Sequence, residues 1–112
     1  MNTKEFSNKH EKKTAKKVRG KTVRNSGAGK FSKGDVRTKH ILIDCKTVTK
    51  EVKSVSIKLE WLEKIRTQAF SQRLQYSAIA FNYEPNGQNY YVISESMFSL
   101  LNEYLESGEN FD

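Results

Sequence analysis

The sequence predicts a single α/β domain in which helices flank a mixed central β-sheet. Residues 40–46 and 76–83 are short apolar stretches with the length and composition of strands. Residues 58–73 and 94–105 repeat apolar side chains at the three- and four-residue spacing of amphipathic helices. Because these helices and strands alternate, and 112 residues suffice for one modest core, one α/β domain is expected.

The first forty residues predict one helix and two short strands. Residues 5–18 have a helix-forming composition of Glu, Lys and Ala, and Gly20 is the expected C-terminal stop. Residues 21–24 form a short strand, and residues 25–30 form a glycine-containing flexible loop. Asp35 opens the second strand.

The middle of the chain contains the third strand, residues 40–46, and the helix 58–73. The charged segment between them is either a loop or the end of a hairpin, with a short extended stretch at 55–57. Leu59, Leu62, Ile65, Arg66 and Ala69 form the stripe of the helix. Trp61 beside that stripe is a core or rim residue, with a dimer contact as the alternative.

The last third predicts two strands and a helix. Residues 76–83 are apolar on both faces, which is typical of a buried central strand. A Pro-Asn-Gly turn at 84–88 leads to a returning strand at 89–93. Ser94 is the expected N-cap of the last helix, whose apolar stripe consists of Met97, Leu100, Leu101, Tyr104 and Leu105. Residues 1–8 and 107–112 are expected to be flexible.

Charge is distributed unevenly, which indicates a polyanionic partner. The chain carries a net charge of +7, yet residues 1–39 hold 13 Lys and Arg against three acids. Such a one-sided basic surface is typical of proteins that bind nucleic acid. The single cysteine excludes an intramolecular disulfide, and no apolar run predicts a membrane span or a signal segment. We therefore expect a cytoplasmic protein with no membrane partner and no small-molecule substrate.

Two acids and a lysine provide the strongest chemical signal. Side chains alternate along a strand, so Asp44 and Lys46 share one face of the third strand and Cys45 lies on the other. Asp35, on the neighbouring strand, is within reach of Asp44. Two carboxylates at a strand end suit Mg²⁺, which keeps several waters and needs few protein ligands. Lys46 can hold a phosphate or the attacking water.

These motifs resemble the PD-(D/E)XK nuclease superfamily. Gly34-Asp35 matches the first acid and Asp44-Cys45-Lys46 matches the (D/E)-x-K element, although Gly34 replaces the signature proline and Asp44 replaces the commoner glutamate. The resemblance implies a restriction-endonuclease-like αβββαβ core, here extended by one strand and one helix. It covers about residues 5–95.

Within the superfamily, the chain is most similar to the archaeal-type Holliday-junction resolvases and related phage-encoded nucleases. The matching residues are Glu11, Arg24, Ser26-Gly27, Gly34-Asp35-Val36, Ile43-Asp44-Cys45-Lys46 and the stretch 59–69. The resemblance implies that Glu11 completes the metal site, with Glu5 as the alternative acid, and that the Cys45 carbonyl also coordinates. It also implies a homodimer. If the chain is phage-encoded, it acts in the host cytoplasm.

The predicted activity is Mg²⁺-dependent hydrolysis of DNA, with Mn²⁺ as a substitute. Asp35, Asp44 and Glu11 hold the metal, and Lys46 positions the nucleophile or stabilises charge. Gly29-Lys30 is no P-loop, because Arg24 and Phe31 occupy positions that the motif reserves for Gly and Ser/Thr. The expected DNA contacts are Lys12, Lys13, Lys16, Lys17, Arg19, Lys21, Arg24, Ser26, Lys30 and Lys33.

Three hypotheses follow for the function. The first is a structure-selective endonuclease that cuts four-way or other branched DNA. The second is a nicking or restriction-like nuclease of the same fold, and the third is a non-catalytic basic protein that binds nucleic acid. Neither His10 nor His40 has a partner at a recognisable spacing, so histidine catalysis is not expected; His10 belongs to the basic helix and His40 to a strand start.

Overall fold

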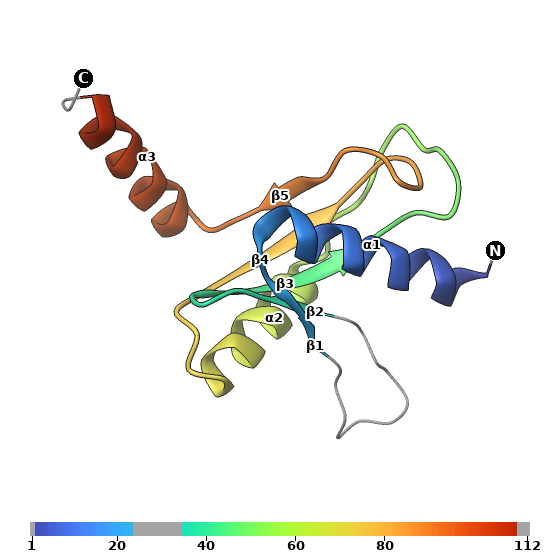
Figure 1. Ribbon diagram of the computed structural model, residues 1–112, viewed down its shortest axis with the longest axis horizontal. Helices are drawn as coiled ribbons and strands as arrows, with labels where there is room; N and C mark the ends of the chain where they lie inside the picture. The colour runs from blue at the N-terminus through green and yellow to red at the C-terminus, as the bar shows by residue number, and fades with distance from the viewer. Residues whose placement is uncertain (1, 24–34, 110–112) are drawn as a thin grey trace.

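The fold is one α/β domain built on a five-stranded mixed sheet (Figure 1). A computed structural model describes residues 2–23 and 35–109. In these residues the strands lie in the order β1-β2-β3-β4-β5, and the pair β3–β4 is parallel while the other pairs are antiparallel. The elements are α1 (Thr3–Val18), β1 (Lys21–Val23), β2 (Asp35–Arg37), β3 (Ile41–Lys46), α2 (Leu59–Ser71), β4 (Tyr76–Phe81), β5 (Tyr90–Val92) and α3 (Glu95–Glu109).

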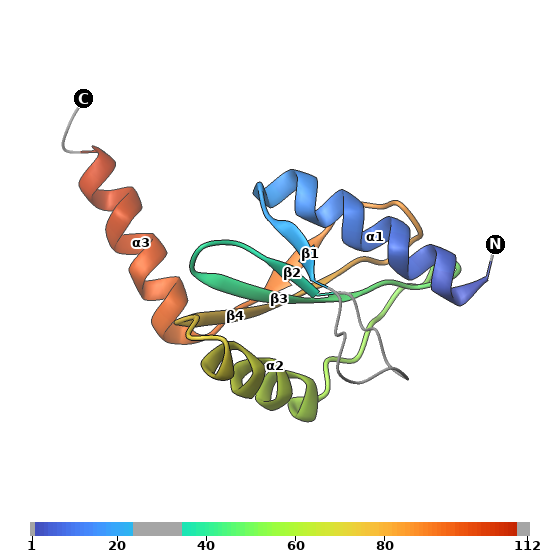
Figure 2. The same cartoon turned by 60° about the horizontal axis from the view of Figure 1, so that its bottom comes forward.

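Two helices cover opposite faces of this sheet (Figure 2). On the α1 side, a buried apolar cluster consists of Ala15, Val36, Ile43, Ala78 and Ala80. On the α2 side, a second cluster consists of Leu42, Ile65, Ala69, Leu74 and Ile79. The alternation of strand side chains sends Leu42 and Ile43 to different clusters, as the sequence predicts. The predicted α/β class and element order are therefore confirmed for the described residues.

Helix α1 begins two residues before its predicted start. Asn2 caps it, because the Asn2 side chain accepts a hydrogen bond from the Glu5 N–H at 2.9 Å. Residues 3–8, expected to be flexible, are therefore helical. At the other end, Arg19 has the left-handed conformation (φ 57°), and Gly20 follows it. A Cβ on Gly20 would lie 2.6 Å from the Arg37 carbonyl oxygen, so the close approach of β2 requires glycine there.

Polar contacts attach α1 to the segment before β5. His10 and Thr14 are buried, although the lysine-rich composition around them suggests a solvated surface. The Asn89 side chain bridges them: its oxygen lies 2.7 Å from His10 Nε2, and its Nδ2 donates to Thr14 Oγ1 at 2.8 Å. This pairing satisfies polar groups that burial would otherwise destabilise. Lys13 adds a hydrogen bond to the Asn86 carbonyl at 2.6 Å.

The turn whose Asn86 carbonyl accepts the Lys13 hydrogen bond is built from the residues that predicted it. The Gly87 N–H donates to the Glu84 carbonyl at 3.0 Å, and Asn86 between them has a φ of 62°. Asparagine tolerates this left-handed conformation better than most residues, which explains its place in the turn. The predicted returning strand follows as β5.

The segment 47–58 contains no strand, although residues 55–57 were expected to be extended. Its start is held by Asn82, which is fully buried and accepts hydrogen bonds from Thr47 Oγ1 at 3.0 Å and the Val48 N–H at 3.3 Å. Its end is held by Ile57, which packs against the α2-side cluster.

Helix α3 extends away from the rest of the domain (Figures 1 and 2). Ser94 caps it as predicted, because its Oγ accepts a hydrogen bond from the Met97 N–H at 3.2 Å. The helix continues to Glu109, past the predicted flexible end at 107. None of residues 95–108 is buried, so the amphipathic stripe, which normally covers a core, is not covered by the part of the chain that the structure describes.

Candidate functional site

Asp35 and Asp44 face each other across two neighbouring strands. The β2–β3 register places them directly opposite, as Val36 is opposite Ile43. Opposed residues in an antiparallel pair share a face and have Cβ atoms roughly 4.5–5.5 Å apart. Both side chains are buried, with exposures of 8% and 7%. The sequence expectation that the two acids converge is therefore met at the level of the backbone register.

Asp44 has one carboxylate oxygen with a cationic neighbour and one without. Its Oδ2 lies 3.4 Å from Lys46 Nζ, which is the ion pair expected from residues two apart on a strand. Its Oδ1 is buried and has no hydrogen-bond partner among the residues that the structure describes. A buried carboxylate oxygen is costly unless something donates to it or coordinates with it. This atom is the best candidate in the site for a ligand of a divalent cation.

Lys46 is held between its acid and an aromatic ring. Its Nζ lies 4.7 Å from the centre of the Trp61 ring, and Lys58 approaches the same ring at 5.7 Å. Trp61 packs on the α2-side cluster, as predicted for a core or rim residue. A cation over an indole face is attracted by the ring's negative electrostatic surface. Helix α2 therefore fixes where the Lys46 ammonium lies.

Cys45 faces the other side of the sheet and remains a thiol. Burial raises the pKa of Cys45 to about 12, and a hydrogen bond to Thr14 only partly offsets this effect. The negative charges of Glu11, Asp44 and Asp35 raise the pKa further. A thiol with this pKa is neither a nucleophile nor a thiolate ligand near neutral pH.

Glu11 acts on the Cys45 thiol from α1, on the face of the sheet that Cys45 shares. Glu11, Asp35 and Asp44 are all close enough to act on the Cys45 thiol. Glu11 is buried in α1, whereas the alternative acid, Glu5, is exposed in the first turn. Among the residues that the structure describes, however, no group of three His, Cys, Asp or Glu side chains is close enough to form a metal site by itself.

This donor set fits Mg²⁺ better than a metal that needs a full protein cage. Mg²⁺ is commonly bound by one or two carboxylates, with waters and substrate phosphates completing its shell. Asp44 and Asp35 are the residues that would hold it, and Glu11 is the third expected ligand. All are hard oxygen donors, which suit Mg²⁺ and Mn²⁺.

The expected DNA-contacting cations differ in their environments. Five are exposed, on α1 and the start of β1: Lys12, Lys16, Lys17, Arg19 and Lys21. Lys13 is half-buried, and its amino group donates to the carbonyls of the β4–β5 turn. Arg24, Ser26, Lys30 and Lys33, like the glycine-containing loop 25–30, lie outside the described residues.

Two cations that sequence reasoning missed join the basic surface. Arg37 and Lys39 line a hollow of about 770 Å³ together with Arg19 and Lys21, and the residues between them complete its wall. Arg37 lies directly opposite Lys21 in the β1–β2 register. Like charges opposed across a strand pair repel each other, so an anion in the hollow would relieve the repulsion. Asp35 and Arg37 are two residues apart on one strand, so the alternation of strand side chains could have indicated that Arg37 lies on the same face as Asp35.

Three aromatic rings cluster at the end of β4, where Phe81 is the strand partner of Lys46. Phe81 is the strand partner of both Lys46 and Tyr90, and its ring centre is 5.6 Å from Tyr83 and 5.9 Å from Tyr90. The two tyrosines are partly exposed. Exposed aromatic rings next to a basic group can stack on unpaired bases.

No family model, curated protein or solved structure matches this chain. The residues themselves therefore carry the functional argument. In the part of the chain that the structure describes, no helix has both the length and the apolar character that a membrane crossing requires.

Proposed function

We propose that the chain is a metal-dependent endonuclease that hydrolyses DNA phosphodiester bonds, with four-way or other branched junctions as its substrate. The observation that carries the proposal is the buried Asp35–Asp44 pair, with Lys46 beside Asp44. The resemblance of these residues to the PD-(D/E)XK motif supports it. The same resemblance supports a homodimer that acts in the cytoplasm.

A restriction-endonuclease-like core is part of this proposal. The element order from α1 to β4 is the αβββαβ order of that core. The acid pair and Lys46 lie on β2 and β3, where the superfamily places its motif.

In this mechanism, the carboxylates would bind the metal and Lys46 would position the attacking water. Asp35 and Asp44 would hold the cation, and Glu11 would add a carboxylate from α1. When bound, Mg²⁺ lowers the pKa of a coordinated water and neutralises charge that develops on the phosphate. Lys46, fixed by Trp61, would orient the attacking water or stabilise the phosphate charge. The ion pair with Asp44 keeps the ammonium next to the metal ligands.

The basic surface would bind the phosphate backbone without reading sequence. Its exposed lysines and arginines can neutralise phosphates, so affinity should fall steeply with salt. Tyr83 and Tyr90 could stack on bases that are unpaired at a branch point. These features favour recognition by shape.

The test compares cleavage of a synthetic four-way junction with that of a matched linear duplex, in Mg²⁺ and in EDTA, for the wild type and for Asp44→Asn. Paired cuts in the junction alone, dependent on Mg²⁺ and lost in the variant, are expected. Cutting of both substrates would favour a nicking or restriction-like nuclease. No cutting at all, with binding unchanged in the variant, would overturn the catalytic proposal.

A second candidate is a non-catalytic protein that binds nucleic acid. It is favoured by the exposed cations of α1 and the start of β1, which can bind phosphates without any metal. Binding that is equal in Mg²⁺ and EDTA, without cleavage, would support this candidate.

A further inference from the structure

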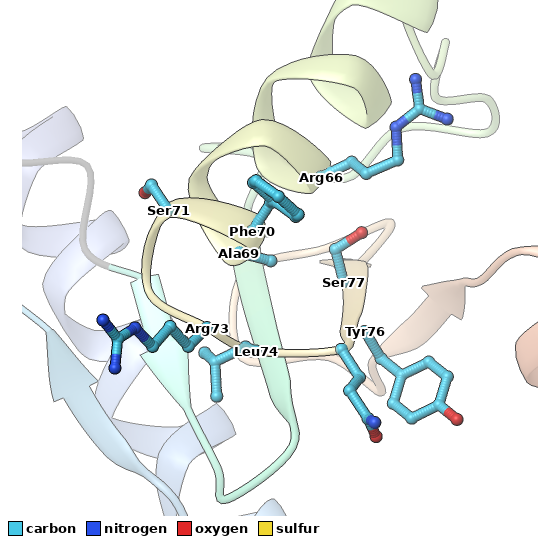
Figure 3. A pocket seen from close by; sticks show the side chains of 9 residues that line it. Arg66, Ala69, Phe70, Ser71, Arg73, Leu74, Tyr76 and Ser77 are labelled. Carbon is cyan, nitrogen blue, oxygen red and sulfur yellow. The ribbon is translucent and has the colours of Figure 1, made fainter.

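A hollow at the C-terminal end of α2 combines an exposed aromatic ring with two cations (Figure 3). Its apolar floor consists of Ala69 and Leu74, which belong to the α2-side cluster. Phe70 lies at its rim and is 83% exposed, although phenylalanine is among the residues most often buried. The hollow measures about 600 Å³, which is enough to receive part of a ligand.

The two cations are Arg66 and Arg73, and they lie on either side of the ring. Arg66 is one turn before Phe70 on the same side of α2, and Arg73 follows just after the helix ends. Figure 3 shows the Phe70 ring between these two side chains, which extend in opposite directions. Both arginines are exposed, the lining contains no acid, and neither arginine has an ion-pair partner within residues 2–23 and 35–109. Both charges are therefore available to an anion.

The backbone at Arg73 gives a second reason to consider its side chain. Arg73 has a φ of 60°, in the left-handed region, and the Leu74 N–H donates to the Ala69 carbonyl at 2.9 Å to close the end of α2. Glycine is the usual residue at such a helix end, because it has no Cβ to strain this conformation. The turn itself therefore favours glycine, and arginine adds a guanidinium group at this position.

A hydrogen bond joins the rim of this hollow to the basic surface. Arg37 Nη1 donates to Gln72 Oε1 at 3.4 Å, and Gln72 directly precedes Arg73. Arg37 also lines the basic hollow that contains Arg19 and Lys21. A polyanion bound at the end of α2 can therefore continue onto the cations of β1 and β2.

The combination of ring and charges selects the ligand. A nucleic-acid strand offers a planar base and an anionic phosphate in every residue, and aromatic side chains beside cations are how proteins bind unpaired strands. The bases of a duplex are stacked on each other and cannot stack on a surface ring, whereas unpaired bases can. We propose that this hollow binds single-stranded DNA, with an unpaired base stacked on Phe70 and phosphates bound by Arg66 and Arg73.

This site is separate from the acid pair. Phe70 follows Trp61, which contacts Lys46, by nine residues in α2, so the two rings are about 13 Å apart along the helix axis and on opposite sides of it. The inference rests on the proposed function for the choice of DNA as the polymer. It adds that the strands unpaired at a branch point have a binding site of their own.

Fluorescence anisotropy in EDTA tests the stacking without any cleavage, with a labelled oligothymidine and a duplex of the same length as probes. Phe70→Ala should weaken binding of oligothymidine by at least about fivefold, the loss expected for one stacked base, and leave duplex binding unchanged. Phe70→Trp should retain the affinity. Its added indole fluorescence should be quenched by oligothymidine but not by the duplex, because only an unpaired base stacks on the ring.

The same titrations in a salt series test the two cations. Arg66→Gln and Arg73→Gly should each weaken oligothymidine binding several-fold and reduce the salt slope by about 0.7, the value for one phosphate contact on a single strand. Arg73→Gly should not lower the urea midpoint, because glycine suits the left-handed position. Lys64→Gln, on the exposed face of α2 outside the hollow, is the matched control and should bind like the wild type.

Three results would overturn the inference. They are a wild type that does not bind oligothymidine, a Phe70→Ala variant that binds it as tightly as the wild type, and a loss in Phe70→Ala that is equal for the duplex. The second result is the one expected if an acidic peptide occupies the hollow. Absence of junction cleavage with these binding differences intact would refute the nuclease and keep the single-strand site. Circular dichroism checks that each variant is folded, which is expected because the three positions lie outside both buried clusters.

Discussion

Asn82 is the buried polar residue whose removal should most affect stability. It is 1% exposed, and its side-chain oxygen accepts hydrogen bonds from Thr47 and Val48. We predict that Asn82→Ala lowers the free energy of unfolding by about 1–3 kcal/mol, because it removes the acceptor of the Val48 N–H and leaves the Thr47 hydroxyl only its longer contact with the Val48 carbonyl at 3.3 Å. Urea unfolding checks this value, and Asn102→Ala, at an exposed position on α3, should change it little. Equal midpoints for the two variants would contradict the prediction.

Trp61 can report on the candidate metal site, because it is the chain's single tryptophan. A cation at Asp44 would displace the Lys46 ammonium from its 3.4 Å contact and change its position over the indole ring. We predict that Mg²⁺ changes the tryptophan fluorescence in a saturable manner, and that Asp44→Asn abolishes this response. The titration needs no substrate. An identical Mg²⁺ response in the variant would show that the metal binds elsewhere.

At this scale, the sequence predicts the acid pair but not the groups that position it. The spacing of Asp44 and Lys46 follows from the two-residue period of a strand, and Gly34-Asp35 marks the partner strand. The contact of Trp61 with Lys46 joins α2 to β3 and has no local signal. Asn89, which holds His10 and Thr14, is even farther away in sequence, 79 and 75 residues from these two partners. Such contacts depend on the tertiary fold.

Helix α1 contains the buried His10, which should make the folding stability of the domain sensitive to mild acid. Burial lowers the pKa of His10 below its ordinary value of 6.5, the hydrogen bond to Asn89 raises it in part, and the Lys13 charge lowers it. In the unfolded chain His10 therefore binds a proton at a higher pH than in the folded chain. Stability is thus complete above pH 6.5 and decreases as the pH falls below it, with a slope of at most about 1.4 kcal/mol per pH unit.

The measurement is urea unfolding between pH 5.5 and 8 in EDTA. His10→Gln should remove most of the pH dependence, because glutamine keeps a polar group near Asn89 but does not titrate. The exposed His40 provides the control, since His40→Gln should retain the wild-type slope. A wild-type slope that persists in His10→Gln would assign the titration to other groups.

Element prediction succeeds wherever local periodicity determines burial. The stripe of α2 and the apolar run of β4 give elements within two residues of their predicted ends, and the Ser94 cap gives the start of α3. The amphipathic pattern of α3 predicts a covered face but not what covers it. The short extended stretch at 55–57 has strand-like alternation, yet it forms no ladder in the described structure, because Ile57 packs on α2 instead.

For the whole molecule, the basic surface should oppose stability and favour binding. Lys21 and Arg37 are directly opposite in the β1–β2 ladder. We predict that Arg37→Gln increases the free energy of unfolding by a few tenths of a kcal/mol, up to about 1 kcal/mol, because it removes the repulsion. The same change should weaken DNA binding several-fold and reduce the salt slope by about one.

Thermal unfolding and a salt series of fluorescence-anisotropy titrations measure both effects. Lys64→Gln, which removes a charge from the exposed face of α2, is the matched control and should leave both quantities near the wild type. A variant that loses stability and keeps its full affinity would contradict the proposed phosphate contact.

The contacts between α1 and the turn before β5 also determine when, during synthesis of the chain, this helix can form all of its native contacts. Helix α1 leaves the ribosome before the strands, and its partner Asn89 follows His10 by 79 residues and Thr14 by 75. At roughly 5–20 residues per second, the helix waits several seconds for that partner. Until then, a lysine-rich segment of this length is only marginally helical in water. The contacts of α1 with Asn89 are therefore among the last native contacts of this helix to form, after its packing on Val36 and Ile43.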